Sequence, residues 1–180
     1  YILSFCDAKL EFIQSNSEKI VIFFFTLNME STFNLTHPLF LGSNSPRRKE
    51  ILTASGFSFT VLPADIDESF DSQMPLEFVP KFLAEEKAKA LVSAILPNSL
   101  VLTADTVVIV DNQILNKPSD KKEAFQMLKQ IAGKTHKVVT GFSIQGPGID
   151  LVDSDEAIVK FRNLDDWEIE YYVKSGAALD

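Results

Sequence analysis

Residues 39–52 place a strand, a tight turn and the start of a helix in immediate succession: Leu39-Phe40-Leu41-Gly42-Ser43-Asn44-Ser45-Pro46-Arg47-Arg48-Lys49-Glu50-Ile51-Leu52. The apolar residues 39–41 predict a short strand, which Gly42 breaks. Ser45 followed by Pro46 is typical of a helix start, with serine at the N-cap and proline at the first helical position. Apolar spacing then resumes at Ile51 and Leu52. The chain is therefore expected to fold as strand, turn and helix at this point.

This junction also carries the groups from which anion sites are built. A helix N-terminus offers unpaired N–H groups and a partial positive charge. Two hydroxyls and two cations add to this N-terminus, from Ser43, Ser45, Arg47 and Arg48. Phosphate is the anion that such a site usually binds. The alternative is a capped surface helix with two solvated arginines, because many strand–helix junctions bind nothing.

Composition narrows the class of protein. The 180 residues are enough for one domain or two small lobes, and 46% hydrophobic with 23% charged residues is typical of a soluble globular chain. A net charge of −8 argues against a general nucleic-acid surface, so the positive charge for an anionic ligand must be local or come from a metal. The single cysteine, Cys6, fits a reducing compartment, and we expect the cytoplasm.

The first 35 residues are set apart as an atypical extension, and residues 36–180 are expected to form the functional domain. The run Ile20 to Leu27 is apolar but far shorter than the roughly 20 residues of a membrane span, and no signal-peptide cleavage site follows it. The chain starts at Tyr1, and Met29 would make a natural start. We therefore expect either a fragment or an over-extended reading frame.

Strands and helices alternate along the rest of the chain without repeats. Helices are predicted over 46–55, 77–95, 121–131 and 165–173, and strands over 39–41, 57–62, 100–110, 113–115, 136–145 and 155–161. The predicted fold class is α/β, with a mixed, largely buried central sheet, helices on both sides and a substrate cleft.

Asp105 is the clearest candidate for chemistry. It lies in the middle of the apolar run 100–110, where a carboxylate is costly unless it is paired, hydrogen-bonded or bound to metal. Its role would be a general base toward water or a metal ligand. The alternative is a member of a buried structural network.

Two lysines are further candidates. Lys87 lies four residues after Leu83 and four before Leu91, on the apolar stripe of its helix. It either extends to water or, if it reaches a cleft, supplies a compact charge for phosphate. Lys117, before Pro118, is a loop cation that is usually just solvated.

An acidic cluster follows the second predicted strand. Asp65, Asp67 and Glu68 form either a solvated loop or ligands for Mg²⁺ or Mn²⁺, which prefer carboxylates together with substrate phosphates. His136 has no neighbouring His or Cys and is predicted to be structural. No P-loop, dinucleotide fingerprint or nucleophile elbow is present in the sequence.

Several segments resemble one known family in the same order along the chain. They are Gly42-Ser43-Asn44-Ser45-Pro46-Arg47-Arg48, Ile66-Asp67-Glu68, Leu83-Ala84-Glu85-Glu86-Lys87-Ala88, Thr103-Ala104-Asp105-Thr106-Val107-Val108, Lys117-Pro118, Gly133-Lys134-Thr135-His136, Thr140-Gly141, Phe161-Arg162-Asn163-Leu164 and Ile169-Glu170-Tyr171-Tyr172-Val173. Over residues 39–180 the chain thereby resembles the Maf nucleotide pyrophosphatases.

The resemblance implies a fold of the Maf and ITPase kind and a function in clearing nucleotide pools. The reaction would hydrolyse a nucleoside triphosphate to monophosphate and pyrophosphate with Mg²⁺ or Mn²⁺, in a chain that forms a homodimer and binds neither nucleic acid nor membrane. Arg-Arg after Ser-Pro, with Ala-Asp-Thr, resembles the branch acting on dTTP and UTP. Asp105 would accept the proton, acting with Glu68 and Lys87, and Glu68 and Asp105 would hold the metal. The substrate would meet Ser43, Arg47, Arg48, Thr106 and Lys117, with Arg47 and Thr106 bearing on base selection.

The chain departs from the family at its end. The family continues with a Gly-Glu-Pro-like turn, further strands and a late glutamine, whereas residues 175–180 replace that turn here. We therefore expect a C-terminally truncated domain. One alternative is a purine enzyme acting on ITP or XTP, although Arg47-Arg48 replaces the Ser/Thr-x-Asn-x-x-Lys pattern of such enzymes. Another is a non-catalytic nucleotide-binding or cell-division regulatory protein.

Overall fold

The computed structural model describes residues 35–95 and 97–176. The expectations for Cys6, for the apolar run Ile20–Leu27, for Met29 and for residues 177–180 fall outside this described part. The chain divides into two compact units. The turn unit comprises described residues 35–106 and 139–155, and the helix-pair unit comprises 107–138 and 156–176.

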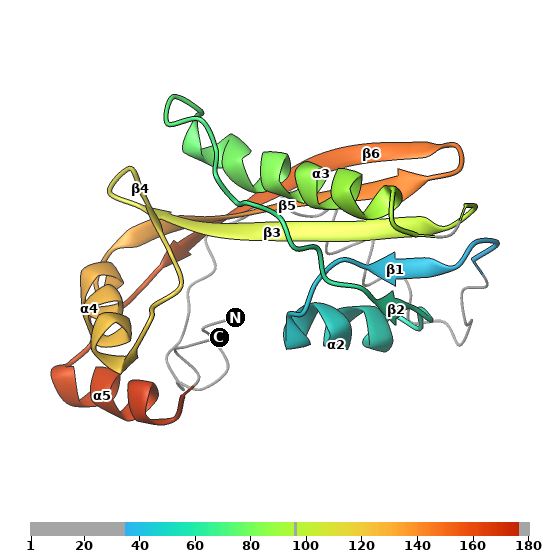
Figure 1. Cartoon of the computed structure of the whole chain (residues 1–180). Helices are drawn as coiled ribbons and strands as arrows, with labels where there is room; N and C mark the ends of the chain where they lie inside the picture. The colour runs from blue at the N-terminus through green and yellow to red at the C-terminus, as the bar shows by residue number, and fades with distance from the viewer. Residues whose placement is uncertain (1–34, 96, 177–180) are drawn as a thin grey trace. The chain divides into compact units, whose positions relative to one another are not determined.

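The strands and helices follow one another as the sequence predicts, as Figure 1 shows. Their order is β1 (Leu39–Leu41), α2 (Pro46–Ala54), β2 (Thr60–Val61), the 3₁₀ helix η1 (Leu76–Phe78), α3 (Val79–Val92), β3 (Leu100–Val110), β4 (Gln113–Leu115), α4 (Lys121–Ile131), β5 (Thr135–Gly146), β6 (Ile149–Lys160) and α5 (Asp166–Lys174).

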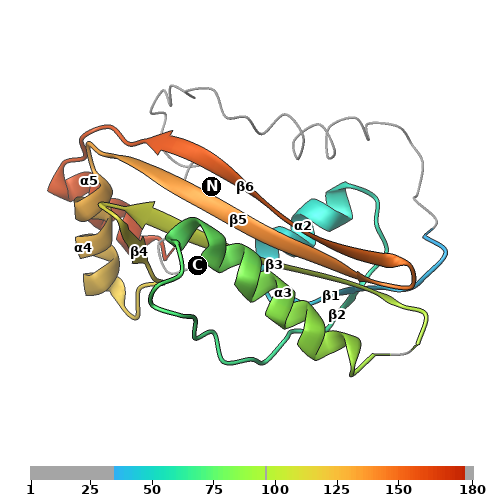
Figure 2. The ribbon, with the colours of Figure 1, turned by 90° about the horizontal axis from the view of Figure 1, so that it is seen from above.

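The sheet is mixed. Its strand order is β2-β1-β3-β5-β6, with β4 paired to β3. Strand β1 pairs in parallel with both β2 and β3, whereas β3 and β4 are antiparallel. Within the turn unit, α3 and α2 lie on opposite faces of the sheet, and Figure 2 shows α3 nearer the viewer. The predicted mixed α/β fold with helices on both sides is confirmed.

Three elements differ from the prediction by more than one residue at a boundary. Strand β2 is short because β1, its partner, is itself only three residues long, so only Thr60 and Val61 pair with it. The helix predicted over 77–95 opens with η1, and α3 starts at Val79 with Pro80 in its first turn, where a missing N–H is tolerated. Strand β6 begins at Ile149 rather than 155, since an edge strand with polar residues lacks the apolar pattern of a buried one.

The core of the turn unit joins α3 to the sheet. Ala88 and Leu91 of α3 pack against Val101 of β3. The first turn of α3 approaches β5 so closely that a Cβ on Gly141 would lie 2.2 Å from the backbone nitrogen of Lys81. This approach requires glycine at position 141, and it fixes the helix that carries Lys87 against the sheet.

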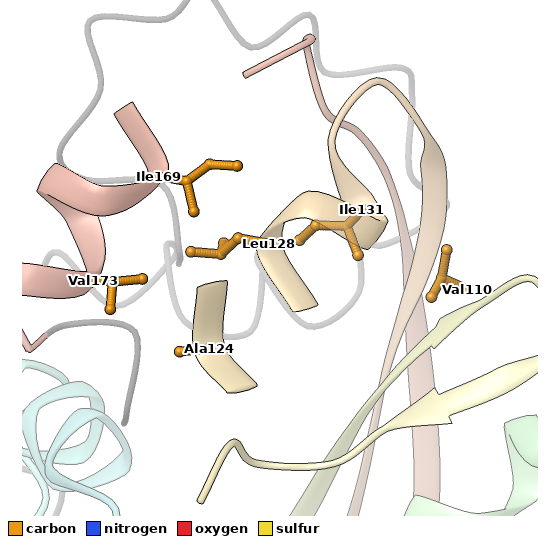
Figure 3. Packing of buried hydrophobic residues seen from close by; sticks show 6 residues of the cluster. All are labelled: Val110, Ala124, Leu128, Ile131, Ile169 and Val173. Atoms are coloured by element: carbon orange, nitrogen blue, oxygen red, sulfur yellow. The ribbon is translucent and has the colours of Figure 1, made fainter. Parts of the chain in front are cut away.

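The core of the helix-pair unit is built by α4 and α5. Figure 3 shows the buried side chains Val110, Ala124, Leu128, Ile131, Ile169 and Val173. Both helices have N-terminal caps: Asp120 accepts from the backbone N–H of Glu123, and Asp165 forms a capping box with Glu168. His136 is buried in this unit, with its ring 5.4 Å from that of Phe161, and burial lowers its pKa.

Among the described residues, no helix is both long enough and apolar enough to cross a membrane.

Candidate functional site

The turn after β1 lies against β3. The N–H of Gly42 donates to the carbonyl of Leu102 (2.8 Å), and a Cβ on Gly42 would come within 2.6 Å of Thr103 Cγ2. Ser45 stands at the N-cap position with Pro46 after it, as predicted, but its hydroxyl makes no capping hydrogen bond. Instead the N–H of Ser45 donates to Ser43 Oγ (3.2 Å). Ser43 is thus the residue that orders the turn.

Arg48 extends from α2 across this turn to β3. Its Nη1 donates to Ser43 Oγ (3.0 Å) and its Nη2 to Thr106 Oγ1 (3.3 Å). Burial lowers the pKa of the Arg48 guanidinium, while the negative charges of Asp105 and Glu68 act in the opposite direction. Within the described part of the chain Arg48 has hydroxyl partners and no salt bridge. An incoming anion would therefore meet a half-buried positive charge that no carboxylate pairs directly.

Lys87 is the centre of a second cluster. Its Nζ lies 2.7 Å from Glu68 Oε1 and 2.7 Å from Asp105 Oδ1. The Lys87 side chain is 10% exposed and that of Asp105 15%, whereas Glu68 is 60% exposed. Lys87 therefore does not extend to water from its apolar stripe; it ends on two carboxylates. Such pairing offsets the cost of burying the lysine and Asp105.

Strand β3 connects the two clusters. Because side chains alternate along a strand, Asp105 and Thr106 leave it in opposite directions. Asp105 reaches Lys87 of α3, and Thr106 reaches Arg48 of α2. Since Leu41, the last residue of β1, pairs with Leu102, the following residues of β3 run past β1 and border the turn. The structure thus gathers six of the predicted site residues: Ser43, Arg48, Glu68, Lys87, Asp105 and Thr106.

The other predicted site residues lie outside these two clusters. Arg47 is exposed on the first turn of α2. Lys117 is exposed in the helix-pair unit, after β4. The carboxylate of Asp67 accepts from the N–H and hydroxyl of Ser69, both at 3.0 Å, so it closes a local turn. Asp65, Asp67 and Glu68 do not converge: in the described ranges, no three His, Cys, Asp or Glu side chains are grouped to hold a metal.

Sequence reasoning assigned no role to Thr140. Its Oγ1 lies 3.0 Å from Thr106 Oγ1. In the sequence it appears only in the Thr140-Gly141 segment of the family resemblance, which names no role for it. Threonine is otherwise common in strands, and its two neighbours, Val139 and Gly141, look like ordinary core residues.

Two carboxylates could contribute to a divalent-metal site. Glu68 and Asp105 converge on one positive point, the Lys87 ammonium. Carboxylate oxygens suit Mg²⁺ or Mn²⁺, and Mg²⁺ is commonly held by one or two carboxylates together with substrate phosphates. Because no third His, Cys, Asp or Glu is grouped with these two carboxylates in the described ranges, the cluster could hold such a metal only together with substrate phosphates.

Comparisons with known proteins agree with the resemblance noted in the sequence. The dTTP/UTP pyrophosphatase of Symbiobacterium thermophilum is 40% identical over 143 residues, which cover 79% of this chain and 73% of that protein. The dTTP/UTP pyrophosphatase of Porphyromonas gingivalis is 42% identical over 142 residues, covering 77% and 71% respectively.

Among solved structures, the Ham1 protein of Staphylococcus aureus is similar with a TM-score of 0.45 and 17% identity, covering 68% of this chain and 71% of that one. The similarity is weak, and the fold class follows from the strand order and helices themselves. The model of the Maf-like protein family matches residues 38–180. This match spans the turn with Ser43 and Arg48 as well as the Lys87 cluster, and the chain therefore belongs to the Maf family.

Proposed function

We propose that this protein hydrolyses dTTP or UTP to the nucleoside monophosphate and pyrophosphate, and so clears these nucleotides from the cellular pool. The observation that carries the proposal is the buried Lys87 held between Glu68 and Asp105, close enough to Arg48 for the two carboxylates to act on its charge. Relatives named dTTP/UTP pyrophosphatase, 40% and 42% identical to this chain, support the substrate class.

Binding would begin with the charge of the triphosphate. Arg48 is oriented by two hydroxyls and has no salt bridge within the described chain, so its guanidinium can form a salt bridge with a phosphate oxygen. Lys87 uses two of its three ammonium protons on Glu68 and Asp105, which leaves the third for a phosphate oxygen. We include Ser43 and Arg47 in this binding surface, and we propose Lys117 as a further substrate-binding cation.

The chemical step would use Asp105 as the proton acceptor. Its Oδ1 is held by Lys87, and Oδ2 accepts no hydrogen bond from the described side chains. A water positioned by Oδ2 would attack the α phosphorus and pass one proton to Asp105 as the bond to the bridging α–β oxygen breaks. Pyrophosphate leaves with that oxygen, and Arg48 and Lys87 stabilise the charge that develops on the phosphates.

Glu68 and Asp105 would hold a divalent cation, Mg²⁺ or Mn²⁺. When bound, such a cation supplies positive charge to the triphosphate and its leaving group. Lys87 would keep the two carboxylates in place, because its ammonium already contacts both. Thr106 and Arg47 are proposed to bear on the choice of base. A homodimer in the cytoplasm completes the proposal, and light scattering of the purified chain would test the dimer.

The test is pyrophosphate release from UTP, dTTP, CTP and ITP with Mg²⁺ or Mn²⁺. Wild type is expected to prefer UTP and dTTP. Asp105→Asn keeps the shape but removes the base, and should lower kcat by roughly 10²–10⁴-fold. Asp150→Asn, an exposed carboxylate on β6 in the same unit, is the matched control and should be unaffected.

Three outcomes would contradict the proposal. Undiminished release by Asp105→Asn would remove Asp105 from the mechanism. Release from ITP alone would move the chain to the purine class. Tight UTP binding without turnover would indicate a non-catalytic nucleotide-binding protein.

A further inference from the structure

We propose that Thr140 is a positioning residue for Arg48, acting through the hydroxyl of Thr106. The three side chains form a hydrogen-bonded series: Arg48 Nη2 lies 3.3 Å from Thr106 Oγ1, which lies 3.0 Å from Thr140 Oγ1. With Ser43, which accepts from Nη1 of the same guanidinium at 3.0 Å, the series spans the turn after β1, then β3 and then β5. These three strands are neighbours in the sheet, in the order β1-β3-β5 (Figure 2).

The donor properties of the groups orient this series. A guanidinium only donates, so Thr106 Oγ1 must accept from Arg48. Thr106 Oγ1 also lies 3.0 Å from Thr140 Oγ1, and either hydroxyl can be the donor of this hydrogen bond. In both arrangements the bond fixes the rotation of the Thr106 hydroxyl and leaves a lone pair of Thr106 for Arg48. A valine at position 140 would free the Thr106 hydroxyl to rotate and would remove this constraint.

Arg48 depends on such support because, in the part of the chain that the structure describes, no stronger interaction holds its guanidinium. Its guanidinium has no salt bridge within the described chain, and its two hydroxyl partners are all that orient the head group. An arginine that is already in position loses less freedom when it binds a phosphate. Thr140 is therefore assigned to substrate affinity, whereas Asp105, which leaves β3 in the opposite direction and bonds to Lys87, serves the chemical step.

The inference rests on the proposed function in one respect: it assumes that Arg48 binds the triphosphate of the substrate. The main test therefore uses a ligand that has no nucleobase and that measures binding without hydrolysis of a nucleotide. Calorimetry of the full chain with inorganic tripolyphosphate should show binding about fivefold weaker for Thr140→Val, equivalent to loss of one hydrogen bond of about 1 kcal/mol. Thr140→Ser keeps the hydroxyl and should bind as wild type does. Ser143→Ala is the matched control: it removes a buried hydroxyl from the same strand, and this hydroxyl has no hydrogen-bond partner among the described residues.

The decisive measurement is a double-mutant cycle with Arg48→Gln. If Thr140 acts through Arg48, Thr140→Val should have no further effect in the Arg48→Gln background, whereas a general structural role would weaken both backgrounds alike. With UTP, Thr140→Val should raise KM by a similar factor and leave kcat within about twofold, as expected for loss of uniform binding. Thr140→Ala serves in place of valine if the latter does not fold.

Two results would overturn the inference: unchanged tripolyphosphate binding by Thr140→Val, or an equal loss in the Arg48→Gln background. Failure of the wild type to bind tripolyphosphate would overturn it as well, because Arg48 would then have no anion to receive. The expected binding pattern without pyrophosphate release from UTP or dTTP would support Thr140 and refute the proposed hydrolysis.

Discussion

Replacement of Lys87 by methionine should destabilise the protein far more than the same change at a surface lysine. The methionine keeps most of the volume of the side chain but removes the cation that contacts both Glu68 and Asp105. Glu68 is 60% exposed, so its carboxylate can be solvated when Lys87 is removed, and the loss of this ion pair should cost little stability. Asp105 is 15% exposed and has no other side-chain partner among the described residues. Leaving that charge unpaired should lower the free energy of unfolding by about 2–3 kcal/mol.

The same helix supplies the control. Lys89 also bridges two carboxylates, Glu85 at 2.8 Å and Glu86 at 2.9 Å, but its side chain is 54% exposed. These ion pairs hold the pKa of Lys89 at about 12, yet solvent screens them, and Lys89→Met should cost less than about 1 kcal/mol. The two substitutions remove the same charge from one helix and differ mainly in burial.

Urea denaturation followed by circular dichroism would measure both losses. The double variant Lys87→Met/Asp105→Asn should be more stable than Lys87→Met alone, because it leaves no buried charge without a partner. Equal losses for the Lys87 and Lys89 variants, or a double variant no better than Lys87→Met, would refute the reasoning from burial.

Two further changes test the packing and the acid response. Gly141→Ala should lower the free energy of unfolding by about 1–3 kcal/mol in urea, because its Cβ would meet the backbone of Lys81 at 2.2 Å; an unchanged midpoint would show that α3 can move off β5. Hydrogen bonds from Arg162 and from the backbone of Asp165 lower the pKa of Glu168 to about 2 from the ordinary 4.5. Glu168 therefore contributes stability above pH 4.5 that is lost as the pH falls toward 2, and Glu168→Gln should flatten this part of an acid titration followed by circular dichroism.

Much of the fold could be predicted because its signals are local. The strand at residues 39–41, the helix after Pro46 and the caps at Asp120 and Asp165 each depend on residues within one turn of each other. The bounds of β3 could likewise be predicted, because they coincide with the ends of its long apolar run. The early start of β6 could not be predicted, because pairing with β5 rather than an apolar pattern makes it a strand.

The sequence by itself identified Asp105 and Lys87 as charges in apolar surroundings, but it did not show that they belong together. They are 18 residues apart, and their hydrogen bond exists because α3 packs on the sheet. Apart from its place in the Thr140-Gly141 segment of the family resemblance, the sequence gives no reason to select Thr140, since its proposed role depends on Thr106, 34 residues away on a neighbouring strand. The sequence shows that a charged residue such as Asp105 lies in an apolar segment, where its burial is costly. Which group offsets this cost is decided by tertiary packing, because the partner lies far away along the chain.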